Sequence, residues 1–287
     1  MTRIFKEPMI AGLTAAILLG LGTTAAMAGQ PEPWQLGFQK AATPIMEQVN
    51  GLHNYLLWVI TAISLFVLGL LVWVVVRYNR RANAQASSFS HNTTVEIVWT
   101  LVPVLILATI ALPSWRLMYF QDQMPDVDMT IKATGYQWYW GYTYPDQELD
   151  EFFSNMIPED EATTSTDYFG DPNVYRLSVD YDVVVPVGKT VRLIVTAADV
   201  LHNFAMPSFG IKMDAVPGRL NETWFRVDEP GMYYGQCSEI CGPRHAFMPI
   251  AIRAVNEAEF DKWVREQKAL AAGDMPVDGD TVLAAAR

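Results

Sequence analysis

Two long stretches of the chain consist almost entirely of apolar residues. Residues 55–76 and 97–115 contain no charged side chain, and each comes close to the roughly 20 residues that a helix needs to cross a bilayer. Tryptophans, which membrane proteins concentrate at the interface, lie near the ends of both stretches at Trp58, Trp73, Trp99 and Trp115. The pattern predicts two membrane-spanning helices that form a hairpin.

The loop between these stretches carries mainly positive charge. It contains Arg77, Arg80 and Arg81, and no acidic residue precedes Glu96. Short loops rich in Lys and Arg stay on the cytoplasmic side of a membrane. We therefore expect this loop in the cytoplasm and both termini on the outer side.

The first 28 residues have the pattern of a secretory signal. Two basic residues precede a short apolar core at 9–21, and the residues 26–28, Ala-Met-Ala, fit a small-x-small cleavage site. A first transmembrane helix is the alternative, but the apolar core is short for a span. We expect residues 1–28 to be a signal peptide, followed by an N-terminal segment and the membrane hairpin at 29–118.

Beyond the second apolar stretch, short alternating segments replace long runs. Residues 190–196 alternate polar and apolar side chains and are rich in β-branched residues, as is typical of a half-buried strand. Further candidate strands lie at 222–227, 232–236 and 249–255. Several short strands with regular turns predict an all-β sandwich or barrel over residues 119–256.

Two segments of this part look peripheral. Residues 147–171 are rich in acidic residues, Ser, Thr and Pro, which indicates a surface excursion between strands. Asn256 offers a helix cap, with Glu259 at the third helical position. We expect an amphipathic helix from there through Lys268, so that residues 257–287 form a C-terminal helix and a loosely ordered tail.

An aromatic stripe occupies residues 135–144. If the stripe is one strand, alternate residues share a face, and Tyr139 points the other way from the five remaining rings. These five are Tyr136, Trp138, Trp140, Tyr142 and Tyr144. A large aromatic core accounts for most of them. An exposed ring beside a redox metal would instead be the place where an incoming electron crosses.

The only two cysteines of the chain lie in a short motif with other soft ligands. Cys237, Cys241, His245 and Met248 fall within 12 residues, on the predicted loop between two late strands. His202 lies on an earlier predicted loop. Thiolate, imidazole and thioether groups together are the ligand set that selects copper.

Other interpretations of this ligand set remain open. A disulfide is the commonest use of two cysteines in an exported protein, but it gives no reason for His245 and Met248. Zinc accepts two Cys and two His and would leave Met248 without a role. One copper of the blue type leaves one cysteine over, whereas two coppers bridged by both thiolates use every ligand.

The part of the chain that follows the hairpin is strongly acidic. From residue 118 onward it holds 13 Lys and Arg against 27 Asp and Glu, a formal charge of −14, whereas the whole chain carries −11. An acidic surface suits either solubility alone or the docking of a basic partner. No nucleic-acid partner is expected.

With these residues in view, the chain resembles subunit II of bacterial cytochrome c oxidases, a family within the heme-copper respiratory oxidases. The resemblance covers the signal, the hairpin, the Gln-Trp-Tyr-Trp stretch at 137–140, the His202 loop and the Cys-Ser-Glu-Ile-Cys-Gly-x-x-His-x-x-Met motif that begins at Cys237. It implies a cupredoxin-like, Greek-key β-sandwich preceded by the two-span helical hairpin.

The resemblance also implies a metal centre with two copper ions, the CuA centre. The metal-binding residues that it implies are His202, Cys237, Glu239, Cys241, His245 and Met248. The two cysteines would bridge both ions, each histidine would bind one ion, and Met248 and the carbonyl of Glu239 would be weak axial ligands. The Glu239 side chain would bind a magnesium ion shared with subunit I.

Further positions match family residues that handle electrons, protons or docking. Trp138 matches the entry point for electrons from cytochrome c, and Glu96 matches a glutamate near the mouth of a proton pathway. The docking candidates are Tyr139, Asp199 and Asp214. Thr143 stands where family members often carry an acidic residue, so one possible docking contact is missing from the pattern.

The function that the resemblance implies is electron entry into a respiratory terminal oxidase of the bacterial inner membrane. Cytochrome c would deliver an electron to the copper domain on the periplasmic side. Heme in subunit I would receive it, oxygen would be reduced to water there and protons pumped, and other oxidase subunits would complete the complex. One rival is subunit II of a quinol oxidase, which shares the fold but lacks the copper ligands. Another is a membrane-anchored copper chaperone, although the 13 methionines here are dispersed.

Overall fold

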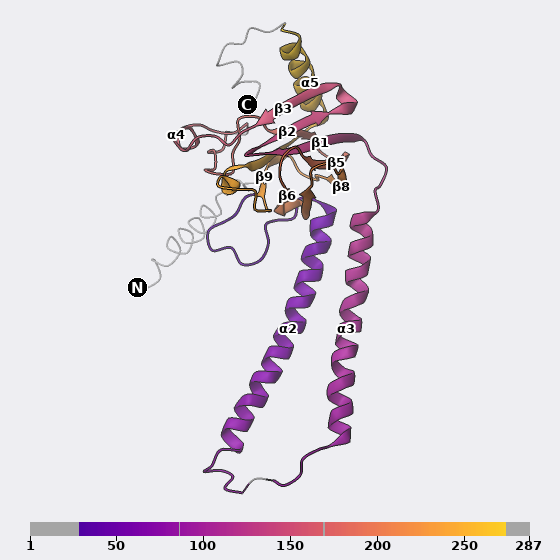
Figure 1. Ribbon diagram of the computed structural model, residues 1–287, viewed down its shortest axis with the longest axis vertical. Helices are drawn as coiled ribbons and strands as arrows, with labels where there is room; N and C mark the ends of the chain where they lie inside the picture. Colours follow the sequence, from indigo (N-terminus) through magenta and orange to yellow (C-terminus); the bar gives the residue numbers. More distant parts are fainter. Residues whose placement is uncertain (1–28, 86, 169, 274–287) are drawn as a thin grey trace, which may run out of the picture.

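The computed structural model describes residues 29–85, 87–168 and 170–273. Two long helices extend from one end of a β-domain, and a shorter helix covers the opposite end (Figure 1). The predicted signal peptide at 1–28 and the predicted tail after residue 273 lie outside the described residues.

The two long helices are α2 (Pro44–Arg77) and α3 (Thr93–Asp122). Both pass the length and hydropathy test for a membrane span, and α3 runs through Pro103 and Pro113. Each extends beyond the apolar stretch that predicted it because a polar side chain caps its first turn outside that stretch. Thr43 accepts a hydrogen bond from the Met46 N–H at the start of α2, and Asn92 accepts one from the Val95 N–H at the start of α3.

The first turn of α2 is part of the β-domain. The Thr43 hydroxyl also donates to the Phe209 carbonyl at 2.8 Å, and Ile45 and Met46 are buried. At the end of α3, the ring of Phe120 packs edge-on against Trp224 at 5.4 Å. The membrane-spanning part and the β-domain are therefore joined by packed side chains as well as by the chain itself.

Within the described residues, ten strands form two five-stranded sheets. The first sheet has the order β3-β2-β1-β5-β8 and the second β4-β10-β9-β6-β7. The strands are β1 (Met129–Tyr136), β2 (Tyr139–Tyr144), β3 (Leu149–Ser154), β4 (Val183–Pro186), β5 (Thr190–Ala197), β6 (His202–Met206), β7 (Ile211–Ala215), β8 (Asn221–Arg226), β9 (Gly231–Cys237) and β10 (Pro249–Val255). β1 pairs with β5 and β4 with β10 in parallel, and the other pairs are antiparallel. The predicted β-sandwich behind a two-helix hairpin is confirmed.

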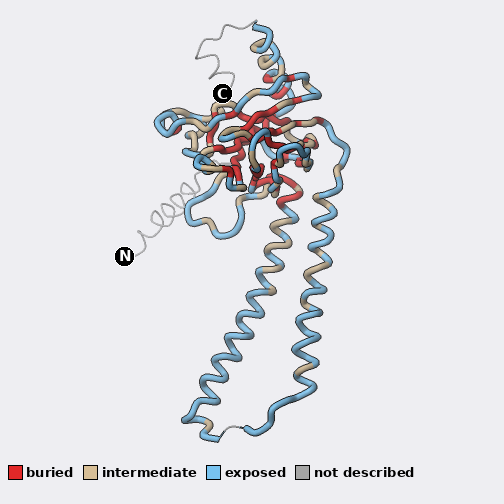
Figure 2. Tube along the Cα trace, in the orientation of Figure 1, coloured by how far each residue is buried: buried red, intermediate tan, exposed pale blue. Residues whose placement is uncertain are grey.

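The hydrophobic core lies within the β-domain, where Figure 2 concentrates the buried residues. Its largest fully buried aromatic side chains are Trp140, Tyr142, Tyr144, Phe204, Phe209 and Phe225. Burial of such side chains is the main favourable contribution to folding. In contrast, most apolar side chains of the long helices are exposed in this chain.

The aromatic stripe differs from the single strand predicted for it. The chain reverses at Gln137 and Trp138, so β1 and β2 form a hairpin in which Tyr136 pairs with Tyr139. The rings of these two tyrosines stack at 4.9 Å instead of facing opposite ways. The turn lacks the Asn-Gly or Asp-Gly pair that usually signals a hairpin. The sequence pattern therefore predicts one strand instead of two. Trp140, Tyr142 and Tyr144 are buried, as expected for a core role.

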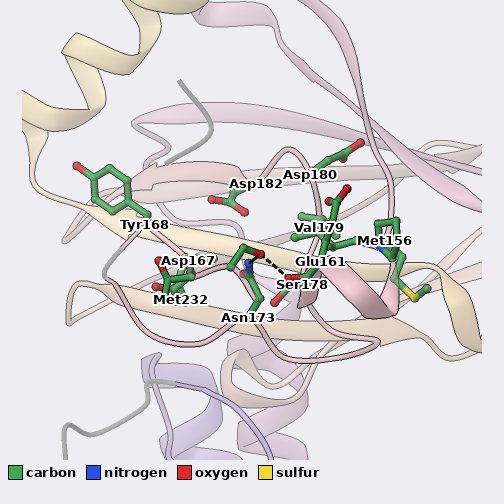
Figure 3. Close-up of a pocket in the computed structure, with 14 residues that line it drawn as sticks. Met156, Glu161, Asp167, Tyr168, Asn173, Ser178, Val179, Asp180, Asp182 and Met232 are labelled. Carbon is green, nitrogen blue, oxygen red and sulfur yellow. Dashed lines mark hydrogen bonds between the residues drawn. The ribbon is translucent and has the colours of Figure 1, made fainter. Parts of the chain in front are cut away.

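The predicted excursion at 147–171 begins later than its composition indicates, because residues 149–154 form β3 at the edge of the first sheet. Residues 155–182 form the actual excursion, which includes the short helix α4 (Glu159–Ala162). A small cluster of buried Val179, Met232, Tyr234 and Ala251 holds it against the second sheet. Between the excursion and β9 lies a pocket of about 510 Å³ (Figure 3).

The last described element is α5 (Glu257–Ala272), which begins where the sequence predicts it. The Asn256 side chain accepts a hydrogen bond from the Glu259 N–H at 3.0 Å and caps the helix. Phe260 and Trp263 are buried on its inner face, and the Trp263 ring lies 5.1 Å from that of Tyr144. The helix therefore closes the end of the sandwich that is farthest from the membrane helices (Figure 1).

Candidate metal centre

The connection between β9 and β10 carries most of the candidate ligands. Cys237 is the last residue of β9, and Met248 immediately precedes β10. Between them, a short 3-10 helix (His245–Phe247) turns the chain back. The paired strands fix both ends of the connection, because Gln236 pairs with Pro249 and the Cys237 N–H donates to the Met248 carbonyl at 3.4 Å.

His202 comes from a neighbouring strand and not from the predicted loop. It is the first residue of β6, which pairs with β9 so that Phe204 lies opposite Cys237. The His202 side chain is completely buried. Its ring packs tightly over Gly135 of β1, where an added Cβ would lie 2.8 Å from the imidazole Cδ2. A strand position gives this ligand a rigid support, as a metal site requires.

The ligand atoms of these residues converge. The ligand atoms of His202, Cys237 and Cys241 all lie within 4.8 Å of one another. The two Sγ atoms are 4.0 Å apart, the Nδ1 of His202 lies 3.9 Å from the Cys237 Sγ, and the Nδ1 of His245 lies 3.5 Å from the Cys241 Sγ. The two sulfurs are thus central, and one imidazole stands beside each.

Two weaker donors complete the group. The Met248 Sδ lies 3.5 Å from the Cys241 Sγ, and the Glu239 carbonyl oxygen lies 3.3 Å from the Cys237 Sγ. Both cysteines are free thiols, and their sulfurs are about twice as far apart as the roughly 2.05 Å of a disulfide bond. This chemistry fits a soft metal ion.

The electrostatics of the two thiols differ. Burial raises the pKa of Cys237, but hydrogen bonds from the His202 ring and from backbone N–H groups outweigh it and lower that pKa to about 7. Burial and the neighbouring Cys237 charge raise the pKa of Cys241 to about 12. Without metal, the Cys241 thiol therefore keeps its proton at neutral pH. A metal ion that binds both sulfurs must displace this proton.

Asp199 holds His202 in its orientation. Its Oδ1 lies 2.9 Å from the His202 Nε2, and its Oδ2 accepts a hydrogen bond from the Gln137 N–H at 2.7 Å. Burial opposes ionisation, but the bonds to His202 and to backbone N–H groups lower the pKa of Asp199. The opposite nitrogen of the ring is then free to face the sulfurs, which is the usual arrangement of a metal-binding histidine. Sequence reasoning considered Asp199 only for docking, and its position three residues before His202 was the available signal.

Trp138 contacts the backbone of a candidate ligand. Its indole Nε1 donates to the Cys241 carbonyl at 3.1 Å, and the Gln137 side chain donates to the same oxygen at 2.9 Å. The indole is half-buried, and its ring lies close to Gly242, where an added Cβ would be 3.0 Å away. The hairpin turn thus places one aromatic ring between the surface and the connection from β9 to β10 at 238–248, here called the metal loop.

The remaining predicted residues lie in different places. Tyr139 packs with Tyr136 and Phe153 in a partly exposed aromatic group next to Trp138. Asp214 lies on β7, where its carboxylate accepts a hydrogen bond from Asn203 at 2.7 Å. The Glu239 side chain is half-exposed on the metal loop. Glu96 lies in the first turn of α3, at the far end of the helix pair from the metal loop (Figure 1).

The pocket in Figure 3 is a separate feature. Its walls include the carboxylates of Glu161, Asp167, Asp180 and Asp182, which belong to the excursion and its return to β4. Asp182 pairs with the buried Arg253 at 3.2 Å. Burial raises the pKa of Asp182 to about 7, although the Arg253 charge opposes the rise. This ion pair joins the excursion to β10.

Comparisons with known proteins agree over almost the whole chain. The family described as "Cytochrome C oxidase subunit II, periplasmic domain" matches residues 129–255, and the family "Cytochrome C oxidase subunit II, transmembrane domain" matches residues 31–117. A probable cytochrome c oxidase subunit 2 of Rickettsia bellii is 50% identical over 246 residues, which cover 85% of this chain and 88% of the relative. Cytochrome c oxidase subunit 2 of Cereibacter sphaeroides is 41% identical over 84% of this chain and 82% of its own length.

Among solved structures, the crystal structure of the periplasmic domain of subunit II of cytochrome oxidase from Bradyrhizobium japonicum is 53% identical. It covers 51% of this chain and 97% of its own, with a TM-score of 0.46. The match to the transmembrane family, together with α2 and α3, establishes a membrane protein with two spans. The chain therefore belongs to the cytochrome c oxidase subunit II family and is a subunit of that oxidoreductase.

Proposed function

We propose that this chain is the electron-entry subunit of its oxidase. It would accept electrons from cytochrome c at a centre of two copper ions and deliver them toward heme in subunit I, where oxygen is reduced and protons are pumped. The observation that carries the proposal is the arrangement of two free thiols at the middle of the site with one imidazole beside each.

The ligands of the centre follow from that arrangement. Cys237, Cys241, His202 and His245 would hold both ions, with weaker contributions from the Met248 thioether and the Glu239 carbonyl. When bound, the pair of copper ions would take up and release one electron at a time.

The protein's own part in this chemistry is rigidity and exclusion of water. Both sulfurs, the thioether and the His202 ring are buried, and Asp199 and the β9–β10 stem fix their positions. A ligand set that is held by packing in this way has little freedom to rearrange when its charge changes. Trp138 would be the entry point for electrons, because its indole is half-buried and hydrogen-bonded to the Cys241 carbonyl.

Cytochrome c would dock on the face around Trp138. The exported part carries a formal charge of −14 from residue 118 onward, which suits a basic partner. Tyr139 and the partly exposed Asp199 lie next to Trp138 and would form part of this face. Asp214 would contribute from β7, although its hydrogen bond to Asn203 also gives it a structural role.

Two further sites would involve subunit I. The half-exposed Glu239 side chain would bind a magnesium ion shared with that subunit. Glu96, half-exposed at the first turn of α3, would lie near the mouth of a proton pathway. The metal domain and both termini would lie on the periplasmic side of the bacterial inner membrane, which the basic loop between the helices supports.

The full set of copper ligands distinguishes this proposal from its rivals. A quinol oxidase subunit II would share the hairpin and the sandwich but would lack these ligands. A copper chaperone would hold its ion in an open, exchangeable site, whereas Cys237, Cys241 and Met248 are buried here. Slow loss of copper to a chelator would separate the electron-entry subunit from a chaperone.

The decisive experiment is copper analysis and electron paramagnetic resonance of the full-length chain in detergent after reconstitution with copper. We expect two coppers per chain and hyperfine structure from one electron shared by two nuclei. Cys237→Ser and Cys241→Ser should each abolish this signal, since each sulfur serves both metals. A single copper with hyperfine structure from one nucleus, or a Cys237–Cys241 disulfide in folded protein that binds no copper, would overturn the proposal.

A further inference from the structure

The segment before α2 carries an exposed apolar tip. Trp34 and Leu36 are 98% and 97% exposed, and Phe38 is 50% exposed. These three residues alternate along residues 34–38 and lie outside the β-domain. A tryptophan and a leucine with almost no protein contact indicate a surface that is covered by something other than this chain.

The tip is held in place at both ends. On one side, Gly29 is buried and its carbonyl accepts a hydrogen bond from the Tyr234 N–H at 3.0 Å. On the other side, the Ser208 hydroxyl donates to the Gln39 side chain at 2.7 Å, and Lys40 pairs with Glu229 at 2.7 Å. Residues 30–38 therefore form a loop that the domain presents in a defined position.

Three hydrogen bonds within the loop pair some of its polar groups. The Gln35 N–H donates to the Glu32 carbonyl, the Gln35 Oε1 accepts from the Glu32 N–H, and the Gln35 Nε2 donates to the Phe38 carbonyl. The turn also gives Trp34 a positive φ of 61°, a conformation that bulky residues rarely adopt. Each polar group that is paired inside the loop lowers the cost of moving the loop into an apolar environment.

The loop lies at the edge of the membrane-spanning region. In Figure 1, this segment hangs below the β-domain beside the upper end of α2. The Phe38 ring lies 4.7 Å from the ring of His53 on α2, two residues before the uncharged apolar stretch begins at Tyr55. Phe38 thus lies beside the start of the apolar stretch, where we expect the boundary between water and hydrocarbon and where Trp is enriched in membrane proteins.

We infer that Trp34 and Leu36 insert into the interfacial region of the lipid bilayer and anchor the metal domain to the membrane surface. The only charged residues in 30–40, Glu32 and Lys40, cancel, so the contact would depend on apolar and aromatic side chains and not on lipid charge. Such an anchor would limit tilting of the β-domain relative to α2 and α3. The inference does not depend on the metal centre, and it can fail or hold independently of the proposed function.

The test uses the full-length chain in phosphatidylcholine nanodiscs, in a background in which Cys237 and Cys241 are replaced by serine. A spin label is attached at Leu36→Cys, and the matched control carries it at Arg265→Cys on the exposed face of α5. We expect the ratio of collisions with oxygen to collisions with a water-soluble nickel chelate to be severalfold higher at position 36. Anionic phosphatidylglycerol should leave this ratio unchanged, and equal ratios at the two positions would overturn the inference.

A second measurement distinguishes lipid from another subunit as the partner. The labelled chain is assembled into the oxidase, and the same ratio is measured again in nanodiscs. We expect position 36 to remain accessible to oxygen from the lipid phase. A label that loses access to both reagents on assembly would show that another oxidase subunit covers the tip, and this result would also overturn the inference. Thermal unfolding that matches the background protein excludes misfolding as the cause of either result.

Discussion

At the scale of single residues, the metal site depends on groups that do not bind metal. Asp199 contacts the far nitrogen of His202, and a carboxylate in that position fixes the orientation and the tautomer of a metal-binding ring. The same carboxylate accepts the Gln137 N–H, so it also ties the β1–β2 turn to the ligand. One side chain therefore couples the ligand with the proposed electron-entry residue next to it.

Removal of this carboxylate should weaken the site without unfolding the domain. Asp199→Ala is expected to lower copper affinity by about 10- to 100-fold, the usual effect of losing such a supporting group. Asp199→Asn, which keeps an oxygen, should lie between this variant and the native protein. Competition with a chelator measures the affinity. Asp146→Ala, which removes a carboxylate at the other end of β1, serves as the control, and equal affinities for all variants would contradict the role.

A substitution at Trp138 should have the opposite effect: it should change the rate of electron entry without changing the metal site. Its indole bonds the Cys241 carbonyl from outside the ligand set. Trp138→Phe keeps an aromatic ring but loses this hydrogen bond, so reduction by cytochrome c should slow while the copper resonance signal persists. Stopped-flow reduction measures the rate. Trp73→Phe on α2 is the matched control, and an unchanged rate in Trp138→Phe would remove Trp138 from the entry path.

At the scale of elements, the hairpin of β1 and β2 connects the core with the metal site. Gly135, near the end of β1, lies under the His202 ring, and the ring leaves no room for a side chain at this position. Gly135→Ala should therefore displace the ring and reduce copper affinity by about tenfold or more. Gly51→Ala adds the same methyl group in open space on α2 and should leave copper binding unchanged. Chelator competition compares the two variants, and equal affinities would contradict the packing argument.

The excursion at 155–182 reaches the metal loop through Arg176. This residue has a φ of 64°, and its guanidinium lies 4.6 Å from the Phe247 ring, between His245 and Met248 in sequence. A cation–π contact at the surface contributes about 0.5–1 kcal/mol. Arg176→Ala should thus speed copper loss to a chelator by roughly two- to fivefold. It should also raise amide exchange in residues 245–248, whereas Arg265→Ala on α5 should change neither. Unchanged exchange and unchanged copper loss would show that the excursion does not hold the loop.

The same elements show which parts of the fold and of the site the sequence alone predicts. Periodicity and turn residues predict the hairpin of long helices, β5, β8, β9, β10 and the cap of α5 because these depend on local patterns. The spacing of Cys237, Cys241, His245 and Met248 predicts a metal motif for the same reason. The β1–β2 turn has no turn signature, and the contacts of Gly135 and Asp199 with His202 exist only because β1 and β6 meet in three dimensions. Packing between distant strands, which no local pattern records, creates that part of the site.

At the scale of the whole molecule, net charge and the partly exposed aromatic group act together. Attraction between an acidic domain and a basic partner extends over about 10 Å at 0.1 M salt and about 3 Å at 1 M. If cytochrome c docks beside Trp138, its association rate should fall by about tenfold or more over this range.

Glu151 accepts a hydrogen bond from Tyr136 in the aromatic group, whereas Glu266 lies on α5. Glu151→Gln should therefore reduce the salt dependence more than Glu266→Gln, although both remove one charge. Stopped-flow rates at several salt concentrations measure the slopes. Equal slopes for the two variants would mean that the domain attracts its partner only through net charge, and a flat native profile would rule out electrostatic steering altogether.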